Sequence, residues 1–326
     1  MKNRHLGIEA CRILAMLMIC NLHVLGMGGI LEKVAIQKNF YYIFANYLEA
    51  FSYSAVNIYI LISGYVGLHS KFSYKKMFSF WLQIIFYTIS ITLIFALFSK
   101  SSVTLSDWLS AFTPISHGQY WYMSCYFGLM LVAPFLNQEL LLPFVSGGFV
   151  YFSIIPTIFK QDSLGLWGGY SVLWMILLYM IGAIINKLDF ENRFKAWQVA
   201  GMIILLTSLT FLLHSLGYEQ WRSYTSPTVI LQGISIFLLF LSLKNLPLTL
   251  KKIVLTLSPL TLGVYLFHVH PLIFRRILPN IYSLVNGQKF VIFVTIILLM
   301  TLLIFIVGAF IEYLRKKLFI FISGKL

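Results

Sequence analysis

Long apolar runs alternate with short polar segments along almost the whole chain. A run of about 20 apolar residues is long enough to cross the hydrocarbon core of a bilayer as a helix. Such runs predict ten membrane-spanning helices: 6–30, 44–68, 77–99, 119–137, 143–159, 167–186, 196–216, 227–243, 253–274 and 290–313. The pattern therefore predicts an all-α, polytopic membrane helix bundle, with residues 1–326 forming a single integral-membrane domain.

Composition supports a membrane protein, and the positions of the charges predict its orientation. Hydrophobic residues make up 60% of the chain and charged residues 10%, and the mean hydropathy is +0.87. The net charge of +14 does not indicate a nucleic-acid partner, because the basic residues are scattered at span ends. With the N-terminus inside, fifteen Lys and Arg residues lie in cytoplasmic segments and eight in outer loops. The positive-inside rule therefore predicts that both termini are cytoplasmic.

The cysteines do not point to disulfides or to a metal. Cys11, Cys20 and Cys125 all fall in apolar spans, and no metal-ligand spacing occurs, so we predict no metal site. No internal repeat is visible, which disfavours a transporter built from two matching halves.

The first predicted span carries three ionisable residues, Glu9, Arg12 and His23. Each such group costs about 2.5–3.5 kcal/mol in hydrocarbon, so three in one span indicate a function. Arg12 and His23 are eleven residues apart, which places them on one face of a helix, about 16 Å apart along its axis. Glu9 precedes Arg12 by three residues and can pair with it.

The orientation suggests a role for each of these residues. Arg12 lies near the inner face, where its planar guanidinium suits a phosphate. His23 lies deeper, in the outer half, and its near-neutral titration suits a general base. Glu9 is about 21 Å from His23 along the helix, so it is predicted to orient Arg12 instead. The structural alternative is that Arg12 reaches the inner surface and His23 makes an interhelical hydrogen bond.

Four motifs occur in order along the chain. The first motif is Arg12 followed by ten residues and His23, and the second is Ser63-Gly64-Tyr65. The third runs from Tyr120-Trp121-Tyr122 through Tyr126 and Pro134 to Asn137. The fourth is Gly263-Val264-Tyr265-Leu266-Phe267-His268. Over residues 5 to about 272 this set resembles the integral-membrane acyltransferase family (acyltransferase type 3), the surface-polysaccharide O-acyltransferases. One segment departs from the family pattern: many members have an arginine-rich run ending in proline where this chain has Lys75 and Lys76. The positive charge is kept there, but the bidentate guanidinium is not.

The resemblance implies an enzyme that moves an acyl group, usually acetyl, from cytoplasmic acyl-CoA to a hydroxyl of a cell-surface polysaccharide or its lipid-linked precursor. The expected location is the plasma membrane, with acyl-CoA as a co-substrate and no permanently bound cofactor. His23 would take the proton of the acceptor hydroxyl or carry the acyl group itself, with Arg12 and Glu9 completing the catalytic set.

The other site predictions combine the motifs with residue chemistry. The acyl-CoA site is predicted to include Arg12, Ser63, Lys75 and Lys76. The acceptor site is predicted to include His268, Asn57, Trp121, Tyr122 and Tyr126. Small polar residues in spans more often hold helices together, and aromatic residues at span ends often form an interfacial belt.

A non-enzymatic alternative uses the same residues. A transporter or flippase for a glycan intermediate could bind a charged head group with buried Arg, Glu and His side chains. The ordered motifs and the lack of repeats favour the enzyme.

Overall fold

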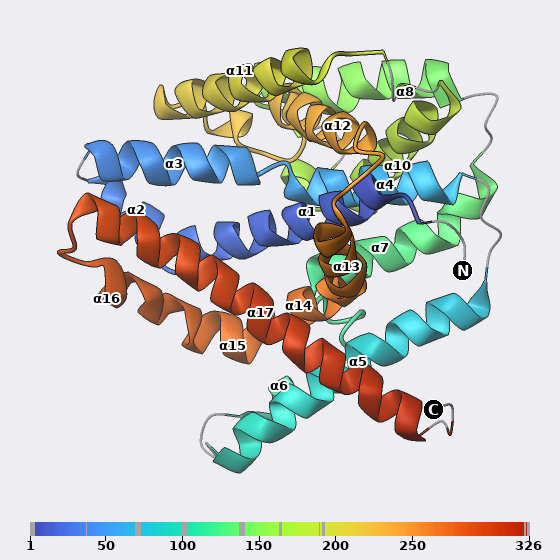
Figure 1. Ribbon diagram of the computed structural model, residues 1–326, viewed down its shortest axis with the longest axis vertical. Helices are drawn as coiled ribbons and strands as arrows, with labels where there is room; N and C mark the ends of the chain where they lie inside the picture. The colour runs from blue at the N-terminus through green and yellow to red at the C-terminus, as the bar shows by residue number, and fades with distance from the viewer. Residues whose placement is uncertain are drawn as a thin grey trace. The chain divides into compact units, whose positions relative to one another are not determined.

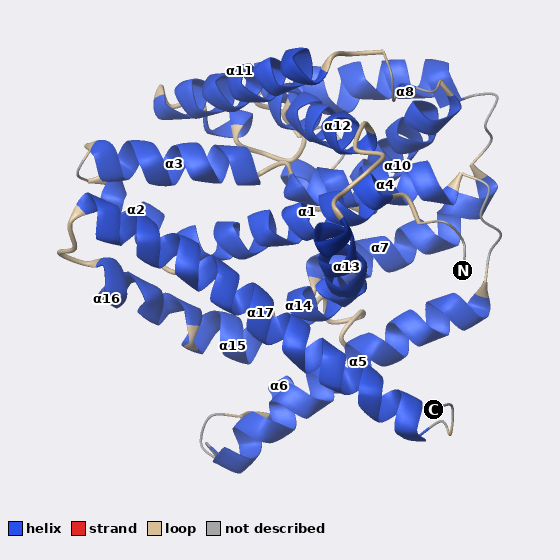
Figure 2. Ribbon diagram, in the orientation of Figure 1, coloured by secondary structure: helices blue, strands red, loops and turns tan. Residues whose placement is uncertain are grey.

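The computed structural model describes residues 4–36, 38–68, 73–98, 103–136, 141–162, 165–188, 190, 193–322 and 324. Every regular element within these ranges is helical, as Figure 2 shows. The all-α prediction is therefore confirmed. Apolar side chains occur on most sides of these helices, as expected for segments that face lipid as well as protein.

The chain forms two compact units. One comprises Met1–Ala15, Asn46–Met77 and Trp121–Leu246, and the other comprises Met16–Ala45, Phe78–Tyr120 and Pro247–Leu326. Three helices, α1 (Leu6–Leu25), α3 (Phe40–Ser52) and α5 (Tyr74–Phe98), pass from one unit to the other. The prediction of a single domain over residues 1–326 stays a prediction.

In the first unit, α4 (Ala55–Gly67) packs along α10 (Val172–Lys187), and α11 (Ala196–Ser215) packs along α12 (Pro227–Leu241) (Figure 1). Further contacts to α10 come from α7 (Trp121–Val132) and α8 (Leu141–Phe149). Glycines allow the closest approach: a Cβ on Gly64 would overlap the carbonyl oxygen of Tyr179, and one on Gly182 would overlap that of Leu61. Small residues at helix contacts are the usual way in which membrane helices come close together.

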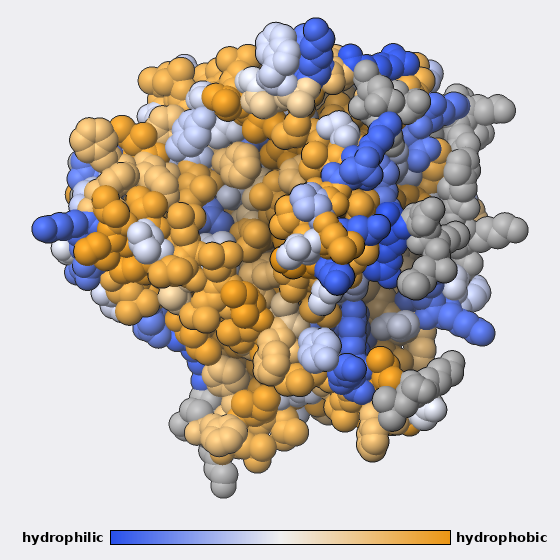
Figure 3. Space-filling view, viewed as in Figure 1, coloured by the Kyte–Doolittle hydropathy of each residue, from blue (hydrophilic) through white to orange (hydrophobic). Residues whose placement is uncertain are grey.

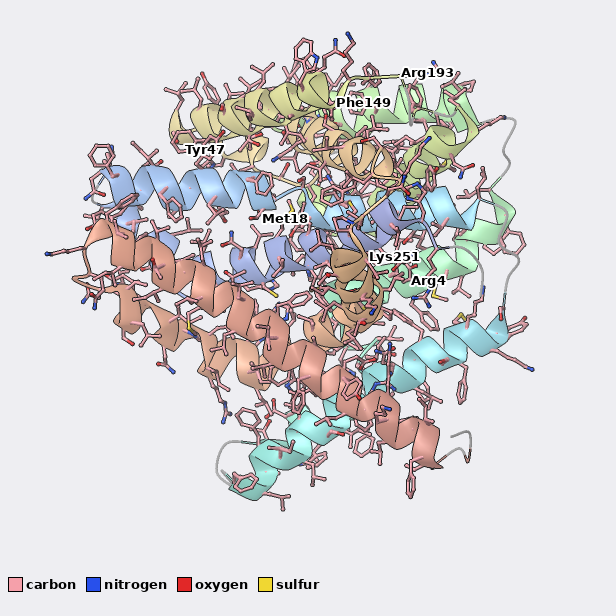
Figure 4. The ribbon with its side chains drawn as sticks, in the orientation of Figure 1. Arg4, Met18, Tyr47, Phe149, Arg193 and Lys251 are labelled. Carbon is pink, nitrogen blue, oxygen red and sulfur yellow. The ribbon has the colours of Figure 1, made fainter. Side chains whose placement is uncertain are left out.

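A side-chain hydrogen bond joins α3 to α11 in the same unit. The hydroxyl of Tyr47 lies 3.2 Å from that of Ser208, and Figure 4 shows Tyr47 between the two helices. This bond adds a polar contact between the two helices.

The second unit is organised around α14 (Thr261–His268) and α17 (Phe290–Ile322), which pack against each other. Its other helices are α2 (Ile30–Ala35), α5 (Tyr74–Phe98, from Phe78 on), α6 (Leu105–Phe112), α13 (Leu248–Leu257), α15 (Pro271–Arg276) and α16 (Ile281–Val285). Gly308 of α17 faces Val264 of α14 so closely that a Cβ would lie 2.8 Å from the Val264 Cα. The packing therefore fixes the backbone of the helix that ends at His268.

Six described helices are long and apolar enough to cross a membrane: Leu6–Leu25, Tyr74–Phe98, Leu142–Phe159, Ala196–Ser215, Leu248–His268 and Phe290–Ile322. Shorter apolar helices cover Trp121–Phe135, Val172–Lys187 and Pro227–Leu241. Figure 3 shows apolar side chains over α17, whose exposed residues include Leu303, Ile306 and Phe310. Large exposed apolar side chains on long helices are typical of lipid contact, so the chain is a multi-pass membrane protein.

The structure interrupts several spans that the apolar pattern predicts as continuous. The second span breaks at Tyr53 and Ser54, between α3 and α4, where the Ser54 hydroxyl donates a hydrogen bond to the Phe51 carbonyl. The fifth contains a π-helical turn at Val150–Ile154, just before Pro156, which supplies no backbone N–H. Prolines also divide the ninth span into α13, α14 and α15. The helices α2, α6 and α16 occupy segments predicted as loops.

Candidate functional site

Arg12 and Glu9 form an ion pair on α1. The Arg12 Nη1 lies 2.9 Å from the Glu9 Oε1, at the predicted spacing of three residues. The Glu9 side chain is 8% exposed and that of Arg12 is 29% exposed. The pairing predicted from the sequence is confirmed, and the buried carboxylate holds one edge of the guanidinium while the rest stays accessible.

A cavity of about 300 Å³ in the first unit opens beside Arg12. Four residues predicted to bind substrates line it: Arg12, Ser63, Lys76 and Tyr126. They come from α1, α4, the first turn of α5 and α7, segments far apart in the sequence. The volume lies within the range of small-molecule sites. Lys75, the fourth residue predicted for the acyl-CoA site, is exposed next to Lys76.

Hydrogen bonds fix the wall of this cavity. The Ser63 hydroxyl donates to the Tyr59 carbonyl at 2.9 Å and lies 3.3 Å from the Tyr126 hydroxyl. The Tyr59 hydroxyl donates to the Arg12 carbonyl at 2.7 Å, which ties α4 to α1. Tyr59 was not predicted as a site residue, since one tyrosine in an apolar span gives no distinctive signal.

A second polar group, in the second unit, contains His23 and His268. The His23 Nδ1 lies 2.9 Å from the His268 Nε2, and the His268 Nδ1 lies 2.6 Å from the Val264 carbonyl oxygen. The His268 side chain is buried, whereas His23 is partly exposed. The Phe274 ring packs against His23 with the two ring planes 86° apart and their centroids 5.0 Å apart. Helix α14 therefore presents His268 directly to α1.

These contacts decide which nitrogens carry protons. A carbonyl oxygen only accepts hydrogen bonds, so the His268 Nδ1 must be protonated. In neutral His268 the Nε2 then holds a lone pair and accepts from the protonated Nδ1 of His23. In neutral His23 the Nε2 is then unprotonated, with its lone pair available. The chemistry that such a nitrogen can perform is proton removal or nucleophilic attack.

The remaining predicted residues are one buried amide, that of Asn57, and the partly exposed rings of Trp121, Tyr122 and Tyr126. Asn57 is fully buried: its Nδ2 donates to the Tyr224 carbonyl at 2.9 Å, and its Oδ1 accepts from the Trp174 Nε1 at 3.4 Å. Its amide is therefore used within the protein. Trp121 packs on Tyr224 with its ring centroid 5.8 Å away.

Two tyrosines link Trp121 to the cavity along α7. Tyr122 stacks on Tyr126 at 5.9 Å, with the ring planes 12° apart, and Tyr126 lines the cavity. Asn137, the last residue of that motif, lies outside the described residues.

The buried charge of Glu312 was not predicted from the sequence. Glu312 of α17 is fully buried and accepts two hydrogen bonds from Arg315, at 2.7 and 2.8 Å, and one from the Tyr87 hydroxyl at 2.8 Å. A Cβ on Gly263 would overlap its side chain, so Glu312 packs directly on α14. The signal was present: an acid followed three residues later by an arginine at the end of a span, as at Glu9 and Arg12.

A comparison with known families matches this chain to one of them over nearly its whole length. The family model described as an acyltransferase domain matches residues 5–316. No curated protein and no solved structure matches the chain. The matched region contains both the cavity at Arg12 and the pair formed by His23 and His268. The chain belongs to the integral-membrane acyltransferases of type 3.

Proposed function

We propose that this membrane acyltransferase moves an acetyl group from cytoplasmic acetyl-CoA to a hydroxyl of a cell-surface polysaccharide or its lipid-linked precursor. The observation that carries the proposal is the 2.9 Å contact between the His23 Nδ1 and the His268 Nε2, which in the neutral pair leaves the His23 Nε2 with its lone pair. A transporter site has no need of a histidine held in one tautomer, whereas acyl transfer to a hydroxyl requires a base.

In the proposed reaction the His23 Nε2 removes the proton from the acceptor hydroxyl. The oxygen attacks the thioester carbonyl, the carbon–sulfur bond breaks, and the proton passes from His23 to the departing thiolate. His268 stabilises the positive charge on His23 through the 2.9 Å hydrogen bond. An alternative route uses the same lone pair: the Nε2 attacks the thioester carbonyl, the carbon–sulfur bond breaks and the thiolate of coenzyme A leaves. The acceptor hydroxyl then attacks the acyl carbon, the bond to Nε2 breaks, and the hydroxyl proton passes to the thiolate.

The cavity at Arg12 is the proposed site for the phosphate-bearing part of the donor. Arg12 keeps guanidinium donors that Glu9 does not use, and Lys76 adds a second positive charge. Lys76 lies in the first turn of α5, where the backbone N–H groups of the helix end also favour an anion. His23 lies about 16 Å further along α1. No permanently bound cofactor is required.

We propose that the protein lies in the plasma membrane with both termini in the cytoplasm. The distribution of Lys and Arg supports this orientation. It would place Arg12 towards the cytoplasmic pool of acyl-CoA and His23 in the outer half of the membrane. The donor would then enter from the inside and the acceptor from the outside.

Mass spectrometry of surface glycan tests the proposal in cells. Cells that make the protein should carry glycan with the mass increment of an acetyl group, and cells lacking it should not. Cells making equal amounts of the His23→Ala variant should resemble the cells without the protein. An unacetylated glycan that still reaches the surface only when the protein is present would favour a flippase instead.

A further inference from the structure

A cluster of aromatic rings in the first unit includes none of the residues that line the cavity. Trp121, Tyr170 and Tyr224 contact one another, with ring centroids 4.4, 5.2 and 5.8 Å apart, and Tyr53 lies 5.1 Å from Tyr224. Each ring comes from the start of a helix or from the loop before it. We call these four residues the aromatic cluster. Under the proposed orientation Trp121, Tyr170 and Tyr224 lie at the outer ends of their spans, and Tyr53 lies at the break between α3 and α4.

The loop beside the cluster holds a tryptophan in an unfavourable backbone conformation. Trp167 has a φ of +48° and its side chain is 73% exposed. The Asp162 carboxylate accepts hydrogen bonds from the backbone N–H groups of Leu166, at 2.6 Å, and of Trp167. Non-glycine residues are rarely held at positive φ, and when they are, they occur preferentially at functional sites.

The same loop is fixed to the segment that carries Tyr224. The Tyr224 backbone N–H donates to the Gly168 carbonyl at 3.1 Å. Gly169, with a φ of +107°, lies so close to Tyr224 that a Cβ would come within 2.6 Å of its Cβ. The loop therefore presents Trp167 and Tyr170 from a fixed position.

An ion pair adds polar groups next to the rings. Arg222, two residues before Tyr224, has its Nη1 2.5 Å from the Glu49 carboxylate and 2.9 Å from the Asn46 Oδ1. The Arg222 side chain is 19% exposed and that of Glu49 is 9% exposed. Exposed aromatic faces together with a few fixed charged and amide groups are the chemistry that recognises a sugar ring, whose C–H faces stack on aromatics and whose hydroxyls form hydrogen bonds.

We propose that Trp167, Tyr170 and Trp121 form a binding surface for the acceptor saccharide, with Arg222 and Glu49 forming hydrogen bonds to its hydroxyls. The inference rests on the proposed function, since the acceptor class proposed above is a glycan. The competing explanation is an interfacial aromatic belt, in which rings anchor span ends in the membrane surface. A belt requires neither a strained tryptophan nor rings that pack on one another.

The experiment compares matched tryptophans. Trp167→Ala and Tyr170→Ala are purified beside Trp197→Ala, whose tryptophan is 70% exposed on α11 outside the cluster. The acceptor is deacylated glycan taken from cells that lack the protein, and the donor is acetyl-CoA. Two quantities are measured for each variant: the apparent KM for glycan and the release of free coenzyme A without glycan.

Loss of one stacking ring should raise the apparent KM for glycan about tenfold in Trp167→Ala and in Tyr170→Ala. Coenzyme A release should not change, and Trp197→Ala should match the parent protein in both measurements. Tyr170→Phe, which keeps the ring, should have the KM for glycan of the parent protein. This result would separate lost stacking from misfolding.

An unchanged KM for glycan in Trp167→Ala and Tyr170→Ala, or an equal rise in Trp197→Ala, would overturn the saccharide site while leaving the proposed function intact. If the parent protein neither releases coenzyme A nor acetylates glycan, the proposed function fails, and the saccharide site fails with it.

Discussion

At the scale of single residues, one hydrogen bond determines how His23 can react. Arg12, Glu9 and His23 stand out in the sequence because charge is costly in an apolar span. The partner of His23 does not stand out, since His268 lies 245 residues away and its position depends on how α14 packs. The sequence predicted His268 as a residue of the acceptor site. The structure places it where it can fix the tautomer of His23, and its contact with an acceptor stays a prediction.

A substitution at His268 tests this role. His268→Leu removes the acceptor for the His23 N–H, so the tautomer is no longer fixed, and we expect kcat to fall about 100-fold. His268→Gln offers an amide oxygen in place of the Nε2 and should keep more activity. The apparent KM for acetyl-CoA should stay unchanged in both variants. Equal losses in the two variants would show that His268 does not act through this hydrogen bond.

The neighbouring lysines provide a matched pair for the donor site. Lys76 lines the cavity, whereas Lys75 is not among the lining residues. We expect Lys76→Ala to weaken acetyl-CoA binding about three- to tenfold, a modest loss because the side chain is exposed to solvent. Lys75→Ala should bind as the parent protein does. Affinities measured by equilibrium binding to protein in detergent check this, and a larger effect at Lys75 would place the phosphates elsewhere.

At the scale of elements, every span predicted from an apolar run contains a helix in the structure. The runs did not predict where these helices break. The length and mean hydropathy of a run indicate that the segment lies in an apolar medium. One residue changes these averages little, so they do not reveal a break. The breaks depend on local backbone chemistry, as at Pro259 and Pro271, where no N–H is available to continue the helix. The His270 Nδ1 accepts from the Leu272 N–H at 3.3 Å and begins α15 instead.

The close packing of α4 against α10 was also not predicted from the sequence. Glycine substitutions test this packing. Gly182→Ala places a methyl group against the Leu61 carbonyl and should lower the melting temperature, because α4 and α10 must move apart. Gly201→Ala in α11 is the control, since no atom lies within 4 Å of its added Cβ. There alanine should stabilise the helix by about 0.5–1 kcal/mol. Shifts of the same sign in both variants would contradict the packing account.

At the scale of the whole molecule, composition and apolar runs were sufficient to predict a multi-pass membrane protein, and the ordered motifs were sufficient to predict its family. Hydropathy could not reveal the cavity, because its lining comes from five helices that meet only in the folded chain. The orientation in the membrane is still a prediction based on the distribution of Lys and Arg.

Labelling of single cysteines tests the orientation. In a background without Cys11, Cys20 and Cys125, cysteines replace the exposed residues Asn245 and Ser283 one at a time. In intact cells, an impermeant thiol reagent should label the cysteine at 283 and leave the one at 245 unlabelled until the membrane is opened. The reverse pattern would place Arg12 at the outer face, away from cytoplasmic acyl-CoA.

The central claim is that His23 performs acyl transfer from a coenzyme A thioester. The most direct measurement is the release of free coenzyme A from acetyl-CoA by purified protein, with and without the His23→Ala substitution. We predict slow release by the parent protein, faster release when deacylated glycan is added, and none above background by His23→Ala, which should still bind acetyl-CoA at Arg12. Equal release by both proteins, or no release by either, would contradict the claim.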